Sequence, residues 1–489
     1  MDRDPILDAF DRLRRRRPTA PLVASPTRRA TVAEVAELAE TAAGHLEAAS
    51  LPPGTVVGLA APDGVAFLAS FVALRRRRLV PLLLEWRSPA AERDRIADGL
   101  GSAWTFTCRR RWPAGAGDWQ LAGRGPRSRP AAELLLDPGT AAVKLTSGST
   151  GRPRGIVTPA EALHADDAAL ARTMGLRADD RIVGAIPLSH SYGLSSVALP
   201  ALIRGSLIVA PEEGSGPYGP LHAARALGAT FFPTVPAFLR ALLASDRPPP
   251  LPESLRLTIT AGATLQPETA ARFRAVYGRP VHVFYGSSET GGICFDREGG
   301  AGERGSVGTP VEGVRVRLAG DDGDPAAGEA PESGVVVVES PAVAAGYLPA
   351  DPARLGAGRF RTGDFGAWRG GELHLVGRTD DLINVRGKKV NPREVEAVLA
   401  GLAGVREAVA FGTEQAEPIL RVVVACDPGD VTPGRVLDWC RDRLAEHKVP
   451  RSVVLIDEIP RTSRGKVDQE AVRSLVPSRA PDVLRSQLR

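Results

Sequence analysis

The chain has 489 residues, of which 43% are hydrophobic and 24% are charged, and this length predicts about three units of roughly 150 residues. The formal net charge is +5, but the arginine runs at 14–17, 75–78 and 109–111 are not interleaved with aromatic residues, so we expect no nucleic-acid partner. No apolar run reaches the ~18 residues of a transmembrane helix, and the N-terminal residues lack the apolar segment of a signal peptide. The four cysteines are scattered, without the spacing of a metal or redox site, which is typical of reduced thiols in a cytoplasmic protein. We therefore expect a cytoplasmic protein with no integral membrane segment.

The first third of the chain alternates helical and strand patterns. Apolar residues at helical spacing predict helices over 31–51 and 64–77, and short apolar runs predict strands over 56–61 and 80–84. This βαβ rhythm indicates a parallel sheet with helices on its faces. Residues 109–130 are rich in Gly, Arg and Pro and are typical of a surface excursion, after which 143–145 reads as a strand.

The alternation continues and then changes character. Helices are expected at 160–174, 194–203 and 218–227, and strands at 181–185, 206–210, 230–233, 257–260 and 281–285. From about 305 to 376 helical patterns vanish, and short strands are expected at 314–318, 334–339, 359–364 and 372–376. After 381 a smaller α+β pattern has helices at 392–402 and 432–444 and strands at 405–412, 420–425 and 452–455. We therefore predict an α/β fold with a large N-terminal domain of parallel α/β sheets plus a β-rich subdomain, residues 1–379, and a small mobile C-terminal α+β domain, residues 381–489.

The stretch LTSGSTGRPRGIVT at 145–158 follows the strand expected at 143–145. Its glycines let successive backbone N–H groups point into one concavity, which can bind a phosphate. Its hydroxyl groups add hydrogen-bond donors, and an arginine adds a positively charged guanidinium that can donate two parallel hydrogen bonds. An ordinary mobile Gly/Ser loop is the alternative, and a Walker A loop is excluded because no Gly-Lys-Ser/Thr follows at the required spacing. The candidate phosphate-binding residues are Thr146, Ser147, Gly148, Ser149, Thr150, Gly151 and Arg154.

Ligands of open α/β sheets bind where strands end at their carboxyl edge. Four loops of small residues are expected there, at 146–155, 187–193, 260–264 and 285–290. The last reads YGSSET: Tyr285 offers a ring for a base, Ser288 a hydroxyl for phosphate, and Glu289 a hard oxygen ligand for Mg²⁺, with Gly286 as a further candidate cofactor-binding residue. The same letters also suit a turn closed by a carboxylate.

These two stretches are followed by GRTDDLINVRGKKVNPREVE at 377–396 and IPRTSRGKV at 459–467. Together they resemble the adenylate-forming superfamily of acyl-CoA synthetases, peptide-synthetase adenylation domains and luciferases, over about residues 30 to 470. That family usually has Lys where this chain has Arg154, and Arg is not assumed equivalent at a phosphate. The resemblance implies ATP and coenzyme A as cosubstrates, with Mg²⁺ held by Glu289.

The resemblance also assigns roles to single residues. It implies that Tyr285 packs on adenine while Gly262 and Ala263 pass over the other adenine face. Further roles are implied for Asp364 on both ribose hydroxyls, Arg378 on ribose and phosphate, Asp380 as the hinge of the small domain, Gly387 beside the path of a pantetheine thiol, and Lys466 as the catalytic cation. The scarcity of lysine in this arginine-rich chain favours a specific role for Lys466, against the usual solvated terminal lysine.

The substrate is indicated by PLSHSYG at 187–193, which resembles the segment carrying His in acyl- and aryl-CoA ligases. His190, as a catalytic-site residue in place of the Asp of amino-acid-activating relatives, favours an acid without an α-amine. We expect a fatty or aryl acid, as in fatty acid metabolism, facing an apolar wall of Phe232, Thr234 and Pro236.

The expected activity is ATP-dependent formation of an acyl-adenylate, followed by transfer to coenzyme A with release of AMP and pyrophosphate. No carrier-protein domain follows residue 489, so the thiol acceptor is expected to be a separate molecule, coenzyme A or a free acyl carrier protein. Arg16, Arg17 and 75–78 suit either the phosphates of coenzyme A or the acidic face of a carrier. Arg154 and the sequence Arg77-Arg78-Leu79, where the family usually has Gly-Ala, leave open a non-catalytic relative that binds nucleotide.

Overall fold

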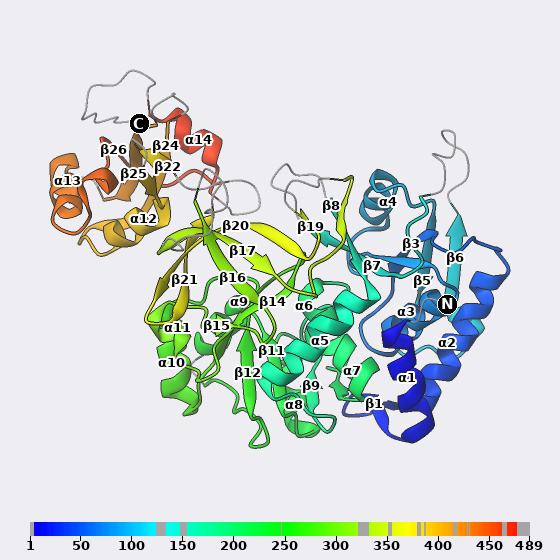
Figure 1. Ribbon diagram of the computed structural model, residues 1–489. Coiled ribbons are helices and arrows are strands. Elements are labelled where there is room, and N and C mark those ends of the chain that lie inside the picture. The colour runs from blue at the N-terminus through cyan, green and yellow to red at the C-terminus, as the bar shows by residue number, and fades with distance from the viewer. Residues whose placement is uncertain are drawn as a thin grey trace. The chain divides into compact units, whose positions relative to one another are not determined.

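The computed structural model describes residues 4–476, apart from 124–133, 147–153, 246, 321–331, 351–354, 379–382, 386–387, 414–417, 428, 430 and 462–466. The chain divides into two compact units, residues 1–362 with 367–374 and residues 363–366 with 375–489. Figure 1 shows sheets flanked by helices in the first unit and a small α+β fold in the second. The α/β fold class predicted from the sequence is confirmed.

The first unit contains two large sheets whose central strands are parallel. The nine-stranded sheet has the order β15 (Thr309–Pro310), β14 (Gly291–Phe295), β13 (His282–Ser287), β12 (Leu257–Thr260), β11 (Phe231–Thr234), β9 (Arg181–Val183), β10 (Leu207–Val209), β1 (Pro21–Ala24) and β2 (Arg29–Thr31). The seven-stranded sheet has the order β18 (Gly346–Leu348), β8 (Arg154–Pro159), β7 (Thr140–Thr146), β4 (Val80–Leu83), β3 (Val56–Ala60), β5 (Trp104–Cys108) and β6 (Trp119–Gly123). In both sheets the central strands are parallel and antiparallel strands lie at the edges.

Helices cover these sheets and share their core. The helices of the first unit are α1 (Pro5–Arg16), α2 (Val32–Glu47), α3 (Val65–Arg76), α4 (Ala90–Gly99), α5 (Ala160–Met174), α6 (Ser191–Gly193), α7 (Leu199–Arg204), α8 (Gly219–Ala226), α9 (Pro236–Leu243), α10 (Pro267–Tyr277) and α11 (Ala301–Arg304), with a 3₁₀ turn at Ala116–Asp118 and a π turn at Leu194–Ala198. One hydrophobic cluster joins Val57 and Phe106 of the seven-stranded sheet with Ile182 and Phe231 of the nine-stranded sheet. Because the two sheets share this cluster, their carboxyl edges keep fixed positions relative to each other within the first unit.

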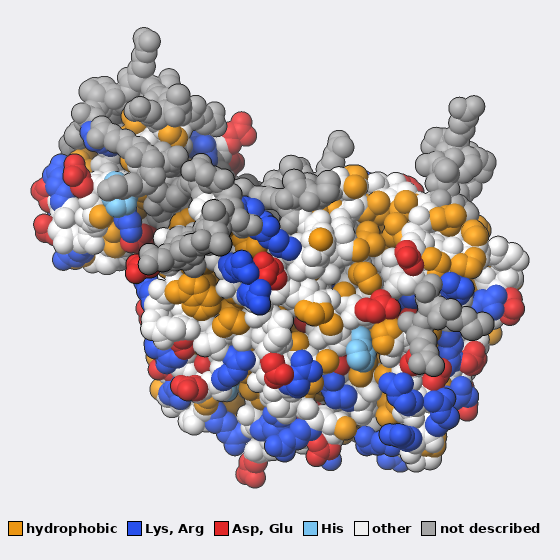
Figure 2. Space-filling view, in the orientation of Figure 1, with side chains coloured by type: hydrophobic (Ala, Val, Ile, Leu, Met, Phe, Trp, Pro, Cys, Tyr) orange, Lys and Arg blue, Asp and Glu red, His pale blue; other side chains and the backbone are white. Residues whose placement is uncertain are grey.

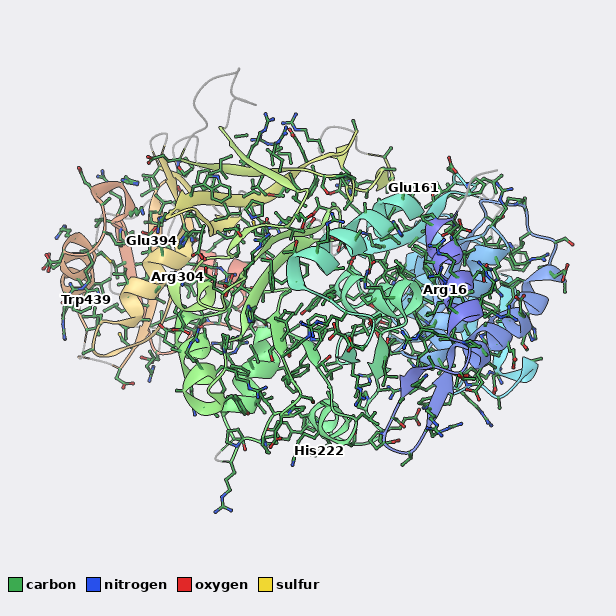
Figure 3. All side chains as sticks on the ribbon, turned by 60° about the horizontal axis from the view of Figure 1, so that its bottom comes forward. Arg16, Glu161, His222, Arg304, Glu394 and Trp439 are labelled. Atoms are coloured by element: carbon green, nitrogen blue, oxygen red, sulfur yellow. The ribbon has the colours of Figure 1, made fainter. Side chains whose placement is uncertain are left out.

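A five-stranded antiparallel sheet follows, and the second unit closes the chain. The five strands are β16 (Arg315–Ala319), β17 (Ser333–Glu339), β20 (Arg359–Arg369), β19 (Leu355–Gly356) and β21 (Glu372–Arg378). The second unit has β22 (Ile383–Val385) paired with β23 (Lys388–Val390), the sheet β24 (Val405–Gly412), β25 (Leu420–Cys426) and β26 (Ser452–Ile456), the helices α12 (Pro392–Ala400), α13 (Pro433–Arg441) and α14 (Gln469–Ser474), and a 3₁₀ turn at Glu446–Lys448. Trp439 of α13 donates its indole N–H to the carbonyl of Val398 at 2.8 Å and so ties α13 to α12 (Figure 3).

Several elements differ from the sequence-based expectation. The stretch 109–130 is not wholly a surface excursion, because β6 pairs antiparallel with β5. The helix expected over 194–203 begins with a π turn, and the sequence patterns did not identify α1, α9, α10 or the strand β8. In α1 the buried Ile6, Phe10 and Leu13 provide an apolar stripe that its many arginines obscured.

The arginine runs have two different roles. Arg16 is exposed in the last turn of α1 (Figure 3), where a cation is favourable at the helix C-terminus. Basic and acidic side chains are intermixed over the face drawn in Figure 2, as expected for solvated charges. Arg75, however, is 4% exposed, which corrects its proposed use as a cation for coenzyme A or a carrier.

Arg75 is a structural residue that connects α3 to its neighbours. Its guanidinium pairs with Asp4 at 3.0 Å and donates to the carbonyls of Leu79, Pro138 and Thr140 at 3.1, 2.9 and 2.5 Å. Thr140 is the first residue of β7, so this arginine anchors the strand that leads to the candidate phosphate loop.

We expect Arg75→Met to lower the free energy of unfolding by about 3–5 kcal/mol, because it leaves three carbonyls and one oxygen of the partly buried Asp4 carboxylate without their partner. Arg77→Met is the matched control: Arg77 pairs with Glu47 at 3.3 Å on the surface, so its loss is expected to cost less than ~1 kcal/mol. Urea unfolding measures both values, and equal losses would contradict the structural role of Arg75.

Candidate functional site

The hairpin of β13 and β14 carries the predicted YGSSET segment. Its turn is held by Ser287, whose hydroxyl lies 3.1 Å from that of Thr290 and accepts the Glu289 N–H at 3.2 Å. Gly291 has φ +69°, and a Cβ there would meet the carboxylate of Asp166 at 2.2 Å, so only glycine fits. These contacts therefore determine the conformation of the turn and the position of Glu289 in it.

Glu289 itself is 9% exposed. Its Oε1 accepts the hydroxyl of Tyr347 at 2.8 Å, and its backbone carbonyl accepts the N–H of Ala344 at 2.8 Å. Tyr347 lies in the edge strand β18, and the guanidinium of Arg154 lies 4.1 Å from the centre of its ring. The sequence analysis gave no role to Tyr347, because a lone tyrosine in a β-rich stretch has no distinguishing pattern.

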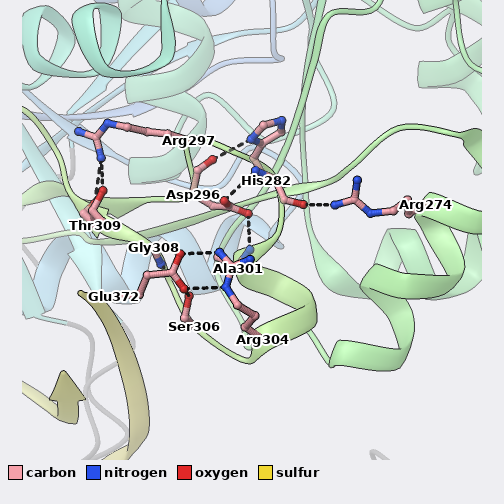
Figure 4. A network of polar contacts seen from close by, with 11 residues as sticks. Arg274, His282, Asp296, Arg297, Ala301, Arg304, Ser306, Gly308, Thr309 and Glu372 are labelled. Carbon is pink, nitrogen blue, oxygen red and sulfur yellow. Dashed lines mark hydrogen bonds and ion pairs between the residues drawn. The ribbon is translucent and has the colours of Figure 1, made fainter. Parts of the chain in front are cut away.

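The base of the same hairpin is held by a second polar network (Figure 4). Asp296 follows β14 and accepts the N–H groups of Gly299 and Ala301 at 2.8 and 3.0 Å. Arg304 forms an ion pair with Glu372 at 2.5 Å, and Glu372 also accepts the hydroxyl of Ser306 at 2.7 Å. These contacts are structural: they hold the hairpin at the end away from its turn.

The PLSHSYG segment lies beside this hairpin. Ser191 donates its hydroxyl to Ser288 at 2.8 Å, and Tyr192 donates its hydroxyl to the carbonyl of Thr234 at 3.2 Å. A Cβ at Gly193 would meet the carbonyl oxygen of Pro187 at 2.1 Å, which requires glycine there. The structure thus brings together the ends of three strands, β9, β11 and β13, and two of the four loops expected at the carboxyl edge, 187–193 and 285–290, meet here.

His190 is a neutral histidine in this arrangement. Its Nδ1 accepts the N–H of Tyr192 at 3.2 Å, so that nitrogen carries no proton. His190 is exposed at the surface, but desolvation of its ring lowers the pKa of the imidazole, and the charge of Glu85 opposes that shift. The imidazole is therefore uncharged near pH 7 and available at Nε2 as a polar contact for an acid.

We expect stability to fall as pH drops from the unfolded-state pKa of about 6.5 through the lower folded pKa of His190, because desolvation disfavours protonation of the ring in the folded protein. His190→Asn retains an acceptor for the helix start and removes this titration. Between pH 6.5 and 5.5 the wild-type melting temperature should fall further than that of the variant. Parallel pH profiles for the two proteins would contradict a lowered pKa of His190 in the folded protein.

A cavity of about 930 Å³ adjoins this segment. The residues that surround it include Asp63, Trp86, Pro187, Thr234 and Phe238. Thr234 therefore lies where the sequence analysis expected a pocket wall, whereas Phe232 is buried in a hydrophobic cluster and packs edge-on against Phe238, with ring centres 5.6 Å apart. Pro236 is the first residue of α9.

The remaining predicted site residues are distributed as follows. Thr146 and Arg154 are paired across β7 and β8, which flank the candidate phosphate loop, while Ser147, Gly148, Ser149, Thr150 and Gly151 lie outside the described residues. Gly262 and Ala263 are exposed after β12, with φ +82° at Gly262.

Asp364 and Arg378 belong to the second unit, where a Cβ at Gly363 would lie 2.6 Å from the Arg378 guanidinium. Asp380, Gly387 and Lys466 lie outside the described residues.

The donor set suits magnesium better than a softer metal. Among the described residues, no three His, Cys, Asp or Glu side chains gather as a metal cage. Mg²⁺ is usually held by one or two carboxylates together with substrate phosphates and water. A single carboxylate such as Glu289, with one oxygen held by Tyr347, fits that requirement.

The family model of the AMP-binding enzymes matches residues 10–348, and that of the AMP-binding enzyme C-terminal domain matches residues 394–466. The chain belongs to the family of AMP-binding enzymes. The resemblance read from the loop and hinge motifs is thereby confirmed.

Similar members of this AMP-binding family include a probable CoA ligase of Humulus lupulus, which is 30% identical over 479 residues, 90% of each chain. A feruloyl-CoA synthase of an Amycolatopsis species is 31% identical and covers 91% of this chain and 93% of its own. ATP-bound MatB from Rhodopseudomonas palustris has a TM-score of 0.76 at 24% identity, over 97% of this chain and 99% of its own, and so supports the fold. None of the described helices is long and apolar enough to span a membrane.

Proposed function

We propose that this protein is an AMP-forming acid–thiol ligase that activates a carboxylic acid with ATP and transfers the acyl group to coenzyme A. The observation that carries the proposal is the hydrogen bond from Ser191 to Ser288. It joins the segment expected to meet the acid, which contains His190, to the segment expected to hold the nucleotide, which contains Tyr285 and Glu289. Membership of the AMP-binding enzymes and relatives named as CoA ligases support the same activity.

The chemistry has two half-reactions. In the first, a carboxylate oxygen attacks the α-phosphorus of ATP, the bond to the β-phosphate bridging oxygen breaks, and pyrophosphate leaves. In the second, a thiol attacks the acyl carbon, the thioester forms, and AMP leaves with the carboxylate oxygen. Two anions meet in the first step, so positive groups and N–H donors aimed at the phosphates supply most of the rate enhancement.

In this proposal Glu289 holds Mg²⁺, which when bound neutralises charge on the phosphates of ATP. The loop residues 146–151 and Arg154 bind phosphate, Gly262, Ala263, Tyr285 and Gly286 enclose adenine, and Asp364 with Arg378 binds ribose. Lys466 acts only in adenylate formation. A hinge at Asp380 between domains 1–379 and 381–489 then removes Lys466 and brings Gly387 to the path of the thiol.

The acid is proposed to lack an α-amine and to be a fatty or aryl acid. His190 supports this because an imidazole with a lowered pKa gives no counter-charge for an ammonium group. Relatives named for ferulate and indoleacetate are consistent with an aryl acid. Since ATP and coenzyme A are abundant in the cytoplasm, we place the reaction there.

Acid-dependent exchange of labelled pyrophosphate into ATP tests this function directly. A panel of fatty, aryl, dicarboxylic and amino acids should give exchange with at least one fatty or aryl acid. Comparison of coenzyme A with a phosphopantetheinylated carrier protein then identifies the acceptor, and faster transfer to the carrier would replace coenzyme A in the proposal. Nucleotide binding without exchange for any acid would instead support a non-catalytic relative.

A further inference from the structure

A buried carboxylate on α5 contacts both segments to which the proposed function assigns a substrate. Asp166 lies within α5 and is 3% exposed. Its Oδ1 accepts the N–H of Gly292 at 2.9 Å, and its Oδ2 accepts the hydroxyl of Ser195 at 2.6 Å. Gly292 belongs to β14 and follows Glu289 closely, while Ser195 lies in the π turn that follows His190. One side chain therefore binds to the hairpin expected to hold the nucleotide and to the segment expected to meet the acid.

The hydroxyls that point toward this link lie on one side of the short helix and π turn that follow the PLSHSYG segment. Ser191, which donates to Ser288, and Ser195 are four residues apart, and side chains at this spacing share a helical face. The π turn at Leu194–Ala198 packs against α5, and such turns occur frequently at functional sites. The link through the carboxylate therefore lies about one turn beyond the direct link from Ser191.

A purely structural role is the alternative for Asp166. Burial of a carboxylate is costly, and a well-packed apolar side chain of similar volume is often at least as stabilising. Stability alone is therefore a weak reason for this carboxylate. Its two oxygens, however, hold donors from two different elements at a fixed separation. A purely structural bond would lower stability when it is lost, but it would not change how one segment responds when the other binds a ligand.

We propose that Asp166 is a positioning residue that couples the acid-facing segment, residues 187–198, to the nucleotide-facing hairpin, residues 282–295. It does so through the hydroxyl of Ser195 and the N–H of Gly292. When a nucleotide orders the hairpin, the carboxylate holds the π turn in place and orders the acid-facing segment before the acid binds. This inference rests on the proposed function, because that function assigns the nucleotide to the hairpin. Neither Asp166 nor Ser195 needs to touch substrate.

The test measures amide hydrogen exchange by mass spectrometry on the full chain, free and saturated with AMP. In the wild type, AMP should slow exchange at least about fivefold in both 282–295 and 187–198, as for ordinary coupling between sites. Ser195→Ala should keep the slowing in the hairpin but reduce it in 187–198 to about twofold or less. A small remainder is expected because Tyr192 and Phe284 still pack together, with ring centres 5.9 Å apart. Each slowing is taken within one protein, so a general loss of stability in the variant cancels.

Ser196→Ala is the matched control. Ser196 is the next residue of the π turn, is 3% exposed, and has an Oγ with no hydrogen-bond partner among the described residues. The substitution removes the same atom without breaking a bond, so both segments should be slowed as in the wild type. If Ser195→Ala does not fold, Ser195→Cys replaces it with the same expectation, because a thiol is only a weak donor.

Equal slowing of 187–198 in the wild type and Ser195→Ala would overturn the inference, and so would an equal loss in Ser195→Ala and Ser196→Ala. Slowing of the hairpin without any slowing of 187–198 in the wild type would also reject the inference and leave the proposed function intact. If AMP does not slow exchange in the hairpin of the wild type, the nucleotide assignment of the proposed function fails, and the coupling fails with it.

Discussion

Lys466→Ala is expected to lower the rate of acyl-adenylate formation by more than ~10²-fold, because it removes a cation from the phosphates at the point where negative charge develops. Thioester formation from supplied acyl-adenylate should keep its wild-type rate, since that step makes no bond to phosphorus. Single-turnover measurement of each half-reaction gives the two rates.

Lys448→Ala is the control for this variant, because Lys448 is another scarce lysine of the second unit and pairs with Glu394 at 2.7 Å. It should leave adenylate formation within about twofold of wild type, as expected for a surface pair. Equal losses in both half-reactions of Lys466→Ala would reject its assignment to the first step alone.

Glu289→Gln is expected to reduce acid-dependent pyrophosphate release about 10²-fold at fixed Mg²⁺, and to raise the Mg²⁺ concentration that gives half of the remaining rate. Glutamine keeps an oxygen that accepts the hydroxyl of Tyr347, so the turn should fold as before. A Mg²⁺ titration of the initial rate at saturating ATP checks both effects.

The control is Tyr347→Phe, which removes the hydrogen bond to Glu289 but leaves the carboxylate charge. Its loss of activity should be about tenfold or less, the scale of one hydrogen bond. A larger loss in Tyr347→Phe than in Glu289→Gln would indicate that the carboxylate is structural.

The sequence predicted much of this fold because its parallel strands are apolar runs separated by helices of regular period. The helix at Ala160–Met174 and the strands of the second unit follow directly from such patterns. Helix α1 was missed because its arginines are as numerous as its buried residues Ile6, Ala9, Phe10 and Leu13, so tertiary contacts rather than composition define it.

The candidate site was partly visible in the sequence for a different reason. Glycines such as Gly193 and Gly291 are required by close contacts, so they mark the turns that carry His190 and Glu289. Tyr347 was not identified, since its hydrogen bond to Glu289 depends on the strands β13 and β18 meeting in space.

The most direct measurement of the central claim uses an active acid labelled with ¹⁸O in its carboxylate. If an acyl-adenylate forms and is then cleaved by a thiol, each AMP produced should carry one oxygen from the acid. AMP without label, formed at the same rate as the thioester, would contradict acid activation through an adenylate.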